Sequence, residues 1–369
     1  MSTATAKLPR GPAYDPWRSW RSREGAEGIV AAGILAANAR NVQPWRFVVD
    51  DGSAAGPAVR VHADPARRQG ALDPFDRELY VGLGCALENM VLAARARGFA
   101  PRVLLCPDAD DPAHAATVVL EPGEPQAGEL YEAIPYRHTN RGPFRPEPLP
   151  PQLLGEIAGL GDKDLAAPAL RWFSTTAERA RVAAHLTEAT KEIVADEDQS
   201  LAGHRWFRAN DREVERSPDG MTVGTQGMPP LMSAIGKRLP APSRRTADRF
   251  WLRQTQNVHL PTAAAFGIVT VPDATRAEDR LEGGRLLQRI HLFATARGLA
   301  VGHLNMMTVR ADRERQLGLP SRFGKVLADL VGDPERQALV TFRIGRPANP
   351  AAASPRRPVA EVLARETDL

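Results

Sequence analysis

Cationic and hydrogen-bonding side chains gather within five residues at Arg137-His138-Thr139-Asn140-Arg141. Two guanidinium groups, an imidazole and a hydroxyl at this spacing suit a phosphate, because arginine binds anionic oxygens through charge-assisted hydrogen bonds. An exposed polar turn before the proline-rich residues 143–151 would explain the same residues. The pattern predicts a compact phosphate site and leaves the turn as its alternative.

A second polar turn, at residues 38–47, follows an expected helix at residues 24–37 and leads into an expected strand. It contains Asn38, Asn41 and Gln43, whose amides are donors and acceptors, and Trp45, whose ring is flat and apolar. These types suit a ring system with a polar edge and an apolar face, such as isoalloxazine. A helix stop followed by a turn explains them equally well.

The elements that would position these residues contain a repeat at an offset of 200 residues. Residues 84–100 and 284–300 share eight identical positions, and each stretch has apolar residues at helical spacing. Gly98 and Gly298 end the two expected helices, since glycine suits the left-handed position after a helix. Two amphipathic helices with glycine stops can also look alike by chance. Apolar strand candidates after both helices favour a repeat.

We therefore expect an α+β chain of two halves, residues 25–128 and 129–369, after an N-terminal extension at residues 1–24. Residues 143–151 are expected to form an extended connector. Strands are expected at residues 47–49, 59–61, 103–105, 118–120, 170–173, 266–271 and 339–344, and further helices at 176–195 and 241–256.

Residues 217–240 combine four glycines with three methionines and several prolines. The stretch is too broken for a core element and too apolar for a solvated linker. It fits a mobile lid over a flat ligand, because methionine adapts to such surfaces. An ordinary long loop with a short helix is an equally good interpretation.

Composition excludes several classes of protein. The chain has 369 residues, 43% hydrophobic residues and a net charge of +4, and its many arginines are scattered among acidic residues rather than gathered in a basic run. We expect no nucleic-acid partner, no secretory leader and no membrane contact. Cys85 and Cys106 are not spaced as metal ligands or as a redox pair, and no metal motif is present, which favours a cytoplasmic location and no metal site.

Both polar motifs resemble the signatures of the nitroreductase superfamily. Asn41, Gln43, Pro44, Trp45 and Phe47 match its Asn-x-Gln-Pro-Trp-x-Phe stretch. The family's usual Pro-Ser before this turn is here Ala37-Asn38, so the resemblance does not extend to its serine contacts with flavin.

The Arg137–Arg141 stretch resembles the family's N-terminal motif for the phosphate and ribityl chain of FMN, although here it falls in mid-chain. With residues 73–79, this arrangement is similar to the Acg-type branch, and the resemblance covers roughly residues 28–363. It implies a nitroreductase-like fold with two fused halves forming an intramolecular pseudo-dimer. It also implies one intact FMN site between the halves and one decayed site.

The resemblance also implies which residues contact FMN and what the protein does. The implied FMN-binding residues are Asn38, Asn41, Gln43, Trp45, Arg137, His138, Thr139, Arg141, Asn305, Arg356 and Arg357. No catalytic side chain is expected, because the flavin N5 carries the chemistry. The implied function is electron transfer from NAD(P)H through FMN to a nitro-aromatic, quinone or similar conjugated acceptor, by a chain that can act as a monomer because the interface is internal.

Two alternatives stay open at this point. In the Acg-type branch a lid can cover the flavin, so an FMN-sequestering protein with little or no NAD(P)H turnover is the rival function. A degenerate pseudo-dimer without any cofactor is a third interpretation. The presence of one complete copy of each half-site motif argues against it.

Overall fold

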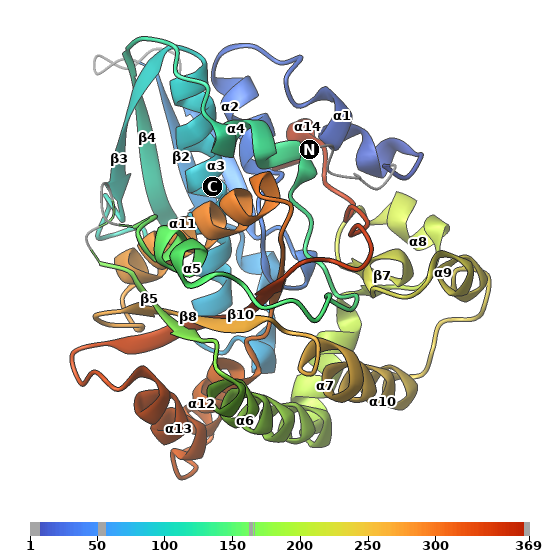
Figure 1. The fold of residues 1–369 in the computed structure, drawn as a ribbon. Helices are drawn as coiled ribbons and strands as arrows, with labels where there is room; N and C mark the ends of the chain where they lie inside the picture. Colours follow the sequence, from blue (N-terminus) through green and yellow to red (C-terminus); the bar gives the residue numbers. More distant parts are fainter. Residues whose placement is uncertain (1–7, 51–56, 162–164, 166, 365–369) are drawn as a thin grey trace.

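The computed structural model describes residues 8–50, 57–161, 165 and 167–364. Residues 1–7 of the expected extension and 365–369 of the expected second half lie outside them. Two four-stranded antiparallel sheets lie on either side of a pair of long helices (Figure 1). In spatial order, the first sheet contains β1 (Trp45–Asp50), β2 (Ala58–Ala63), β4 (His114–Pro122) and β3 (Phe99–Leu105). The second contains β5 (Ala169–Phe173), β8 (Ala265–Val271), β10 (Gln337–Gly345) and β9 (Ala300–His303).

Each sheet has the same strand order in its own half: first, second, fourth, third. The helix between the second and third strands is α3 (Arg77–Ala96) in the first half and α11 (Ala277–Ala296) in the second. Gly98 and Gly298, just after these helices, both have positive φ angles, 83° and 69°. The two halves are therefore built alike, as the 200-residue repeat predicts.

The central helices cross backbone against backbone. A Cβ added at Gly84 would lie 2.1 Å from the carbonyl oxygen of Leu281, and one added at Gly284 would lie 2.3 Å from that of Val81. These two contacts exchange under an offset of 200 residues, so the crossing lies on a pseudo-two-fold axis. Only glycine allows such an approach.

Buried polar contacts accompany this crossing. Glu88 of α3 accepts hydrogen bonds from Arg285 and Arg289 of α11, at 2.9 and 2.6 Å. Asn89 accepts one from Gln288 at 2.7 Å. These bonds satisfy polar groups that would otherwise be costly to bury, and they fix the register of the two halves.

The remaining helices cover the sheets or connect them. Helices α6 (Thr176–Ala195), α12 (Met306–Gln316) and α13 (Arg322–Val331) pack on the second sheet opposite α11 and enclose a second hydrophobic core (Figure 1). The others are α1 (Asp15–Ser19), α2 (Gly25–Gly33), α4 (Glu129–Ala133), α5 (Pro151–Ala158), α7 (Glu197–Arg205), α8 (Asp211–Arg216), α9 (Pro230–Gly236), α10 (Arg244–Gln254) and α14 (Val359–Val362). A two-stranded parallel pair, β6 (Phe207–Arg208) and β7 (Met221–Thr222), completes the set.

The end of the chain returns to the first half. Leu363 bridges to Phe47 of β1, and the amide of Ala364 donates to the carbonyl of Phe47 at 2.8 Å. Helix α14 packs on α2 and β1. The C-terminal segment therefore ties the second half to the first sheet.

Within the described residues, α3 has the length and apolar composition of a membrane-spanning helix, but 78% of that stretch is buried inside the protein. It lies between the first sheet and α11, so its apolar surface is that of a core helix.

Most expected elements are present, with shifted ends. The helix expected at residues 24–37 ends at Gly33, because the chain turns there to approach the polar residues 38–43. The helix expected at residues 241–256 begins at Arg244, where Ser243 caps it by accepting from the amide of Thr246. It runs on into a π-helical turn, Thr255–His259.

Candidate functional site

A cavity of about 520 Å³ lies between the two halves. Its walls come from α3 and α11, from β9 of the second sheet, and from the segment that joins β7 to α10. Most of the wall is apolar. All three methionines of the expected lid, Met221, Met228 and Met232, line it. A flat, mostly apolar molecule therefore fits this space better than a strongly hydrated one.

A much smaller cavity, about 20 Å³, adjoins the first, and Asn38, Thr139 and Arg141 line both. Arg137 and Arg356 complete its cationic wall. The structure thus brings three arginines together from the Arg137–Arg141 motif and from the C-terminal segment, more than 200 residues further along the chain.

These guanidinium groups lack anionic partners. In the part of the chain that the structure describes, Arg137 donates to the carbonyl of Leu35 at 3.0 Å, and Arg356 donates to Asn41 and to backbone carbonyls, but neither forms an ion pair. Their Nε atoms are buried without any hydrogen-bond partner. An uncompensated buried cation is unfavourable, so the cluster is arranged for an anion that comes from outside the chain.

Burial, and repulsion between neighbouring guanidinium groups, both disfavour the charged forms of these arginines. Burial lowers the pKa of Arg137 to about 10, and burial and the nearby Arg40 lower that of Arg141 to about 10. Burial, with the charge of Arg137 beside it, holds the pKa of Arg356 well below its ordinary value. A bound dianion would reverse this effect, because an opposite charge favours the protonated guanidinium.

Four imidazoles surround the arginines and are uncharged at neutral pH. Burial and the neighbouring arginine charges lower the pKa values of His138, His259 and His303 to about 3 and hold that of His291 far below its usual range. His259 Nε2 lies 3.1 Å from the carbonyl oxygen of Arg141 and supports the motif from behind. The site therefore adds hydrogen-bonding groups without adding positive charge.

The N-terminal segment closes the small cavity, a role that sequence reasoning missed. Trp17 of α1 lines it, meets the ring of His138 edge to face at 4.6 Å between centroids, and lies under the guanidinium of Arg356 at 4.7 Å. Its indole N–H donates to the carbonyl of Ser354. A signal in the sequence is the presence of Trp17 and Trp20 within the N-terminal extension.

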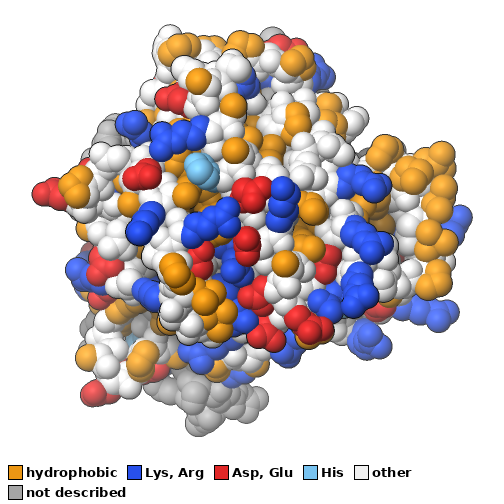
Figure 2. All heavy atoms as spheres, turned by 90° about the horizontal axis from the view of Figure 1, so that it is seen from below, with side chains coloured by type: hydrophobic (Ala, Val, Ile, Leu, Met, Phe, Trp, Pro, Cys, Tyr) orange, Lys and Arg blue, Asp and Glu red, His pale blue; other side chains and the backbone are white. Residues whose placement is uncertain are grey.

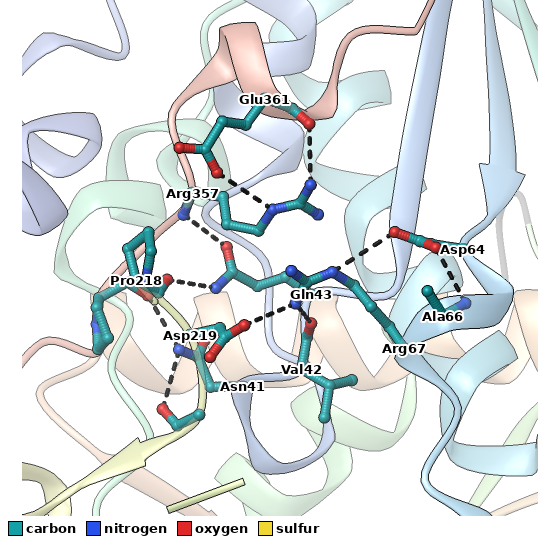
Figure 3. A network of polar contacts seen from close by, with 12 residues as sticks. Asn41, Val42, Gln43, Asp64, Ala66, Arg67, Pro218, Asp219, Arg357 and Glu361 are labelled. Atoms are coloured by element: carbon teal, nitrogen blue, oxygen red, sulfur yellow. Dashed lines mark hydrogen bonds and ion pairs between the residues drawn. The ribbon is translucent and has the colours of Figure 1, made fainter. Parts of the chain in front are cut away.

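The polar turn at residues 38–43 is held in an unusual backbone conformation. Arg40, Asn41 and Gln43 all have positive φ angles, between 49° and 57°. Non-glycine residues in this region cost about 1–3 kcal/mol each and persist only when their surroundings fix them. The amide of Gln43 donates to the carbonyl of Pro218 at 2.8 Å and accepts from the backbone N–H of Arg357 at 2.8 Å (Figure 3).

Three residues expected at the flavin line neither cavity. Both polar groups of the Gln43 side chain are used within the protein, Trp45 is fully buried in the core, and Arg357 turns toward Glu361 (Figure 3). Motif matching identifies residue types but not their directions. In this structure the three act from behind the site.

Asn41 has an intermediate position. It borders the small cavity, yet its amide donates to the carbonyls of Gly220 and Pro355, and its oxygen accepts from Arg356 at 2.5 Å. It therefore orients Arg356 and links the turn to the start of the lid segment.

Asn305, at the start of α12, does line the large cavity. Its side chain donates to Glu78 at 2.9 Å and accepts from the amide of Thr341 at 3.1 Å. Glu78 also accepts from Arg40 at 2.7 Å. Sequence reasoning missed Glu78 and Arg40, which with Asn305 form a polar strip on the cavity wall.

The lid segment, residues 217–240, is not free along its whole length. Gly220 exchanges hydrogen bonds with Asn41, β7 pairs with β6, and Asp219 forms ion pairs with Arg67 and Arg208. The start of the segment, at Pro218 and Gly220, is thus anchored to the turn (Figure 3). The part that projects over the cavity is α9 and the residues after it, up to Pro242.

The chain is similar to known proteins over most of its length. No family model matches the chain. The candidate NAD(P)H nitroreductase acg of Mycobacterium tuberculosis H37Rv is 26% identical over 352 residues, which cover 91% of this chain and 94% of that protein. Another candidate NAD(P)H nitroreductase of the same strain is 28% identical over 282 residues, or 75% of each chain. This similarity, which extends over most of the chain, supports the nitroreductase superfamily and its Acg-type branch.

Solved structures with some likeness carry related descriptions. The FMN-dependent nitroreductase NfnB from Mycobacterium smegmatis, in complex with NADPH, is 16% identical with a TM-score of 0.41; the match covers 64% of this chain and 98% of NfnB. A nitroreductase with bound FMN from Desulfitobacterium hafniense is 14% identical with a TM-score of 0.39, over 65% of this chain and 99% of that one.

Proposed function

We propose that the chain binds one FMN between its halves and acts as an NAD(P)H-dependent oxidoreductase on a flat, conjugated acceptor. The observation that carries this proposal is the pair of adjoining cavities. The smaller one is lined by arginines that have no anionic partner among the described residues, and the larger one is roomy and mostly apolar. FMN has the matching parts, a phosphate dianion joined to a planar ring system.

In this proposal the phosphate is held by Arg137, Arg141 and Arg356. The buried Nε atoms of Arg137 and Arg356, and Nδ1 of His138, have no partner within the described chain and are suited to anionic oxygens. Trp17 closes the cavity from the N-terminal side and keeps water away from these charges. Exclusion of water strengthens each of their electrostatic interactions.

The larger cavity would hold the ring system and the acceptor. When bound, FMN accepts a hydride and passes electrons to a second substrate, so this chain needs no nucleophile or general acid of its own. Asn305, Glu78 and Arg40 offer donors and acceptors along one wall. The methionines of the lid and Trp251 of α10 offer apolar surfaces on the other, which favours nitro-aromatics or quinones over charged acceptors.

Sequestration of FMN is the second candidate function, and one observation favours it. The lid residues that line the cavity belong to a segment that is tied at Pro218, Asp219 and Gly220 to the polar turn and its neighbours, so the segment is positioned to cover the cavity. A cover that stays closed would keep NAD(P)H and the acceptor away from the flavin.

Anaerobic addition of NADPH or NADH to the flavin-loaded protein distinguishes the two functions. Loss of the visible flavin absorbance within the turnover time of ordinary enzymes supports the oxidoreductase. Persistent absorbance supports sequestration. A failure to retain FMN at all would contradict both, because each depends on the arginine-lined cavity.

A further inference from the structure

The lid segment carries several large apolar side chains that are exposed. Leu231 is 72% exposed and Leu239 57% exposed, and Met232 and Ile235 between them are also exposed. These four account for nearly half of the large hydrophobic side chains that are exposed in the described part of the chain. An apolar group of this kind on a protein surface marks a place where something binds.

The exposed residues share one side of a short helix that projects from the body of the molecule. Leu231, Met232 and Ile235 lie on α9 at helical spacing, and Leu239 follows one turn later. Met232, Ile235 and Leu239 also border the large cavity. The apolar surface therefore lies at the rim of the large cavity, and whatever binds there lies at the cavity mouth.

Positive charge surrounds this apolar surface. Residues 228–245 contain Lys237, Arg238, Arg244 and Arg245 and no acidic residue. Lys237 pairs with Asp211 and Arg244 with Glu197, whereas Arg238 and Arg245 are exposed and form no ion pair with any described residue. Figure 2 shows hydrophobic side chains gathered at the right edge, below which Lys and Arg side chains lie, where Figure 1 places α9.

We propose that residues 230–245 dock the protein on an anionic lipid surface. Apolar side chains on a short amphipathic helix, with cationic residues beside them, enter the boundary between headgroups and acyl chains, and basic residues add attraction to anionic headgroups. A second copy of this chain fits the surface less well, because each copy carries the same unpaired arginines and would repel the other. This proposal departs from the expectation of no membrane contact that the composition suggested.

Flotation of the whole protein with vesicles tests the proposal. Phosphatidylcholine vesicles are compared with vesicles that also contain phosphatidylglycerol, at low and high salt. The protein is expected to float with the anionic vesicles, weakly with the neutral ones, and less at high salt. Equal binding to both compositions, or none to either, would overturn the proposal.

Matched variants test whether vesicle binding depends on residues 230–245 or on non-specific adsorption of the protein. Leu231→Gln, whose side chain does not line the cavity, should weaken binding to anionic vesicles about tenfold or more. Its control is Leu317→Gln, an exposed leucine after α12, which should leave binding unchanged. The double variant Arg238→Gln, Arg245→Gln should weaken binding about 25-fold, since each basic residue near the surface contributes about fivefold.

The charge control is Arg171→Gln, Arg181→Gln, which removes the same net charge from exposed arginines elsewhere. Equal losses in the lid variants and in their controls would overturn the docking site. So would a dimer in size-exclusion chromatography that Leu231→Gln converts to a monomer, because a second copy would then be the occupant. Thermal unfolding of each variant confirms that it is folded, and FMN retention reports separately on the proposed function.

Discussion

Removal of Arg137 should stabilise the protein without FMN while it weakens FMN binding. Burial lowers the pKa of this arginine from 12.5 to about 10, and each pKa unit corresponds to about 1.4 kcal/mol. At pH 7 the Arg137 guanidinium is charged in both the folded and the unfolded protein, because neutral pH lies below both pKa values. The folded protein therefore bears the full cost of burying this charge, roughly 3 kcal/mol. Loss of the hydrogen bond to Leu35 offsets about 1 kcal/mol of this.

Arg137→Met should therefore raise the free energy of unfolding of the flavin-free protein by about 2 kcal/mol. The dissociation constant for FMN should rise about tenfold to a hundredfold, because a charge-assisted hydrogen bond contributes roughly 1.5–3 kcal/mol. Riboflavin, which lacks the phosphate, should bind the wild type and the variant almost equally. Urea unfolding with and without FMN, and fluorescence titration with both flavins, measure these effects.

Arg77→Met is the matched control for a buried arginine that has a partner. Arg77 forms a bidentate ion pair with Asp312, so its removal leaves a buried carboxylate unpaired and should cost about 3–5 kcal/mol. The reasoning is refuted if Arg137→Met destabilises the flavin-free protein as much as Arg77→Met does. It is also refuted if Arg137→Met weakens riboflavin and FMN binding to the same degree.

Three further changes test other parts of the structure. Gly284→Ala should cost more than about 3 kcal/mol in urea unfolding, because the new Cβ meets the carbonyl of Val81, whereas Gly155→Ala, with nothing within 4 Å, should be neutral or stabilising. The free energy of unfolding should fall as pH drops from about 6.5 towards 3. In this range buried His259 stays neutral in the folded protein, whereas the unfolded chain takes up a proton there. His259→Gln should make the free energy of unfolding depend less steeply on pH. A Gly/Ser linker of equal length in place of residues 231–239 should keep FMN bound and speed its reduction by NAD(P)H in stopped-flow measurements, and an unchanged rate would show that α9 is no barrier.

The sequence predicted the repeated core well, for a physical reason. The helices α3 and α11 and their neighbouring strands carry strong periodic patterns and glycine stops, which local reasoning detects. The crossing at Gly84 and Gly284 could not be predicted from one helix alone, because it depends on two backbones meeting. In the sequence, only the 200-residue repeat, which matches Gly84 with Gly284, pointed to this crossing.

The candidate site was predicted in part. The Arg137–Arg141 motif, Arg356 and the lid methionines do line the two cavities. Trp17 was missed because its role depends on a contact with the C-terminal segment more than 300 residues away in the sequence. Gln43 and Trp45 were expected at the ligand because their types suit one, but the positive φ angles of the turn and the bonds of Gln43 to other segments follow from tertiary packing.

The lid expected at residues 217–240 was also predicted only in part. Composition left two interpretations open for residues 217–240, a mobile lid and an ordinary long loop with a short helix. Asp219 and Gly220 are instead anchored by ion pairs and hydrogen bonds to distant residues, which composition does not reveal. Only α9 and the residues after it keep the character of a cover.

Titration of the flavin-free protein with FMN, followed by flavin fluorescence, tests the central claim most directly. One arginine-lined cavity between two unequal halves predicts saturation at one FMN per chain, and competition by inorganic phosphate against FMN but not against riboflavin. Saturation at two FMN per chain would contradict the single site. Tight binding of FMN that phosphate does not disturb, or no binding at all, would contradict the role of Arg137, Arg141 and Arg356.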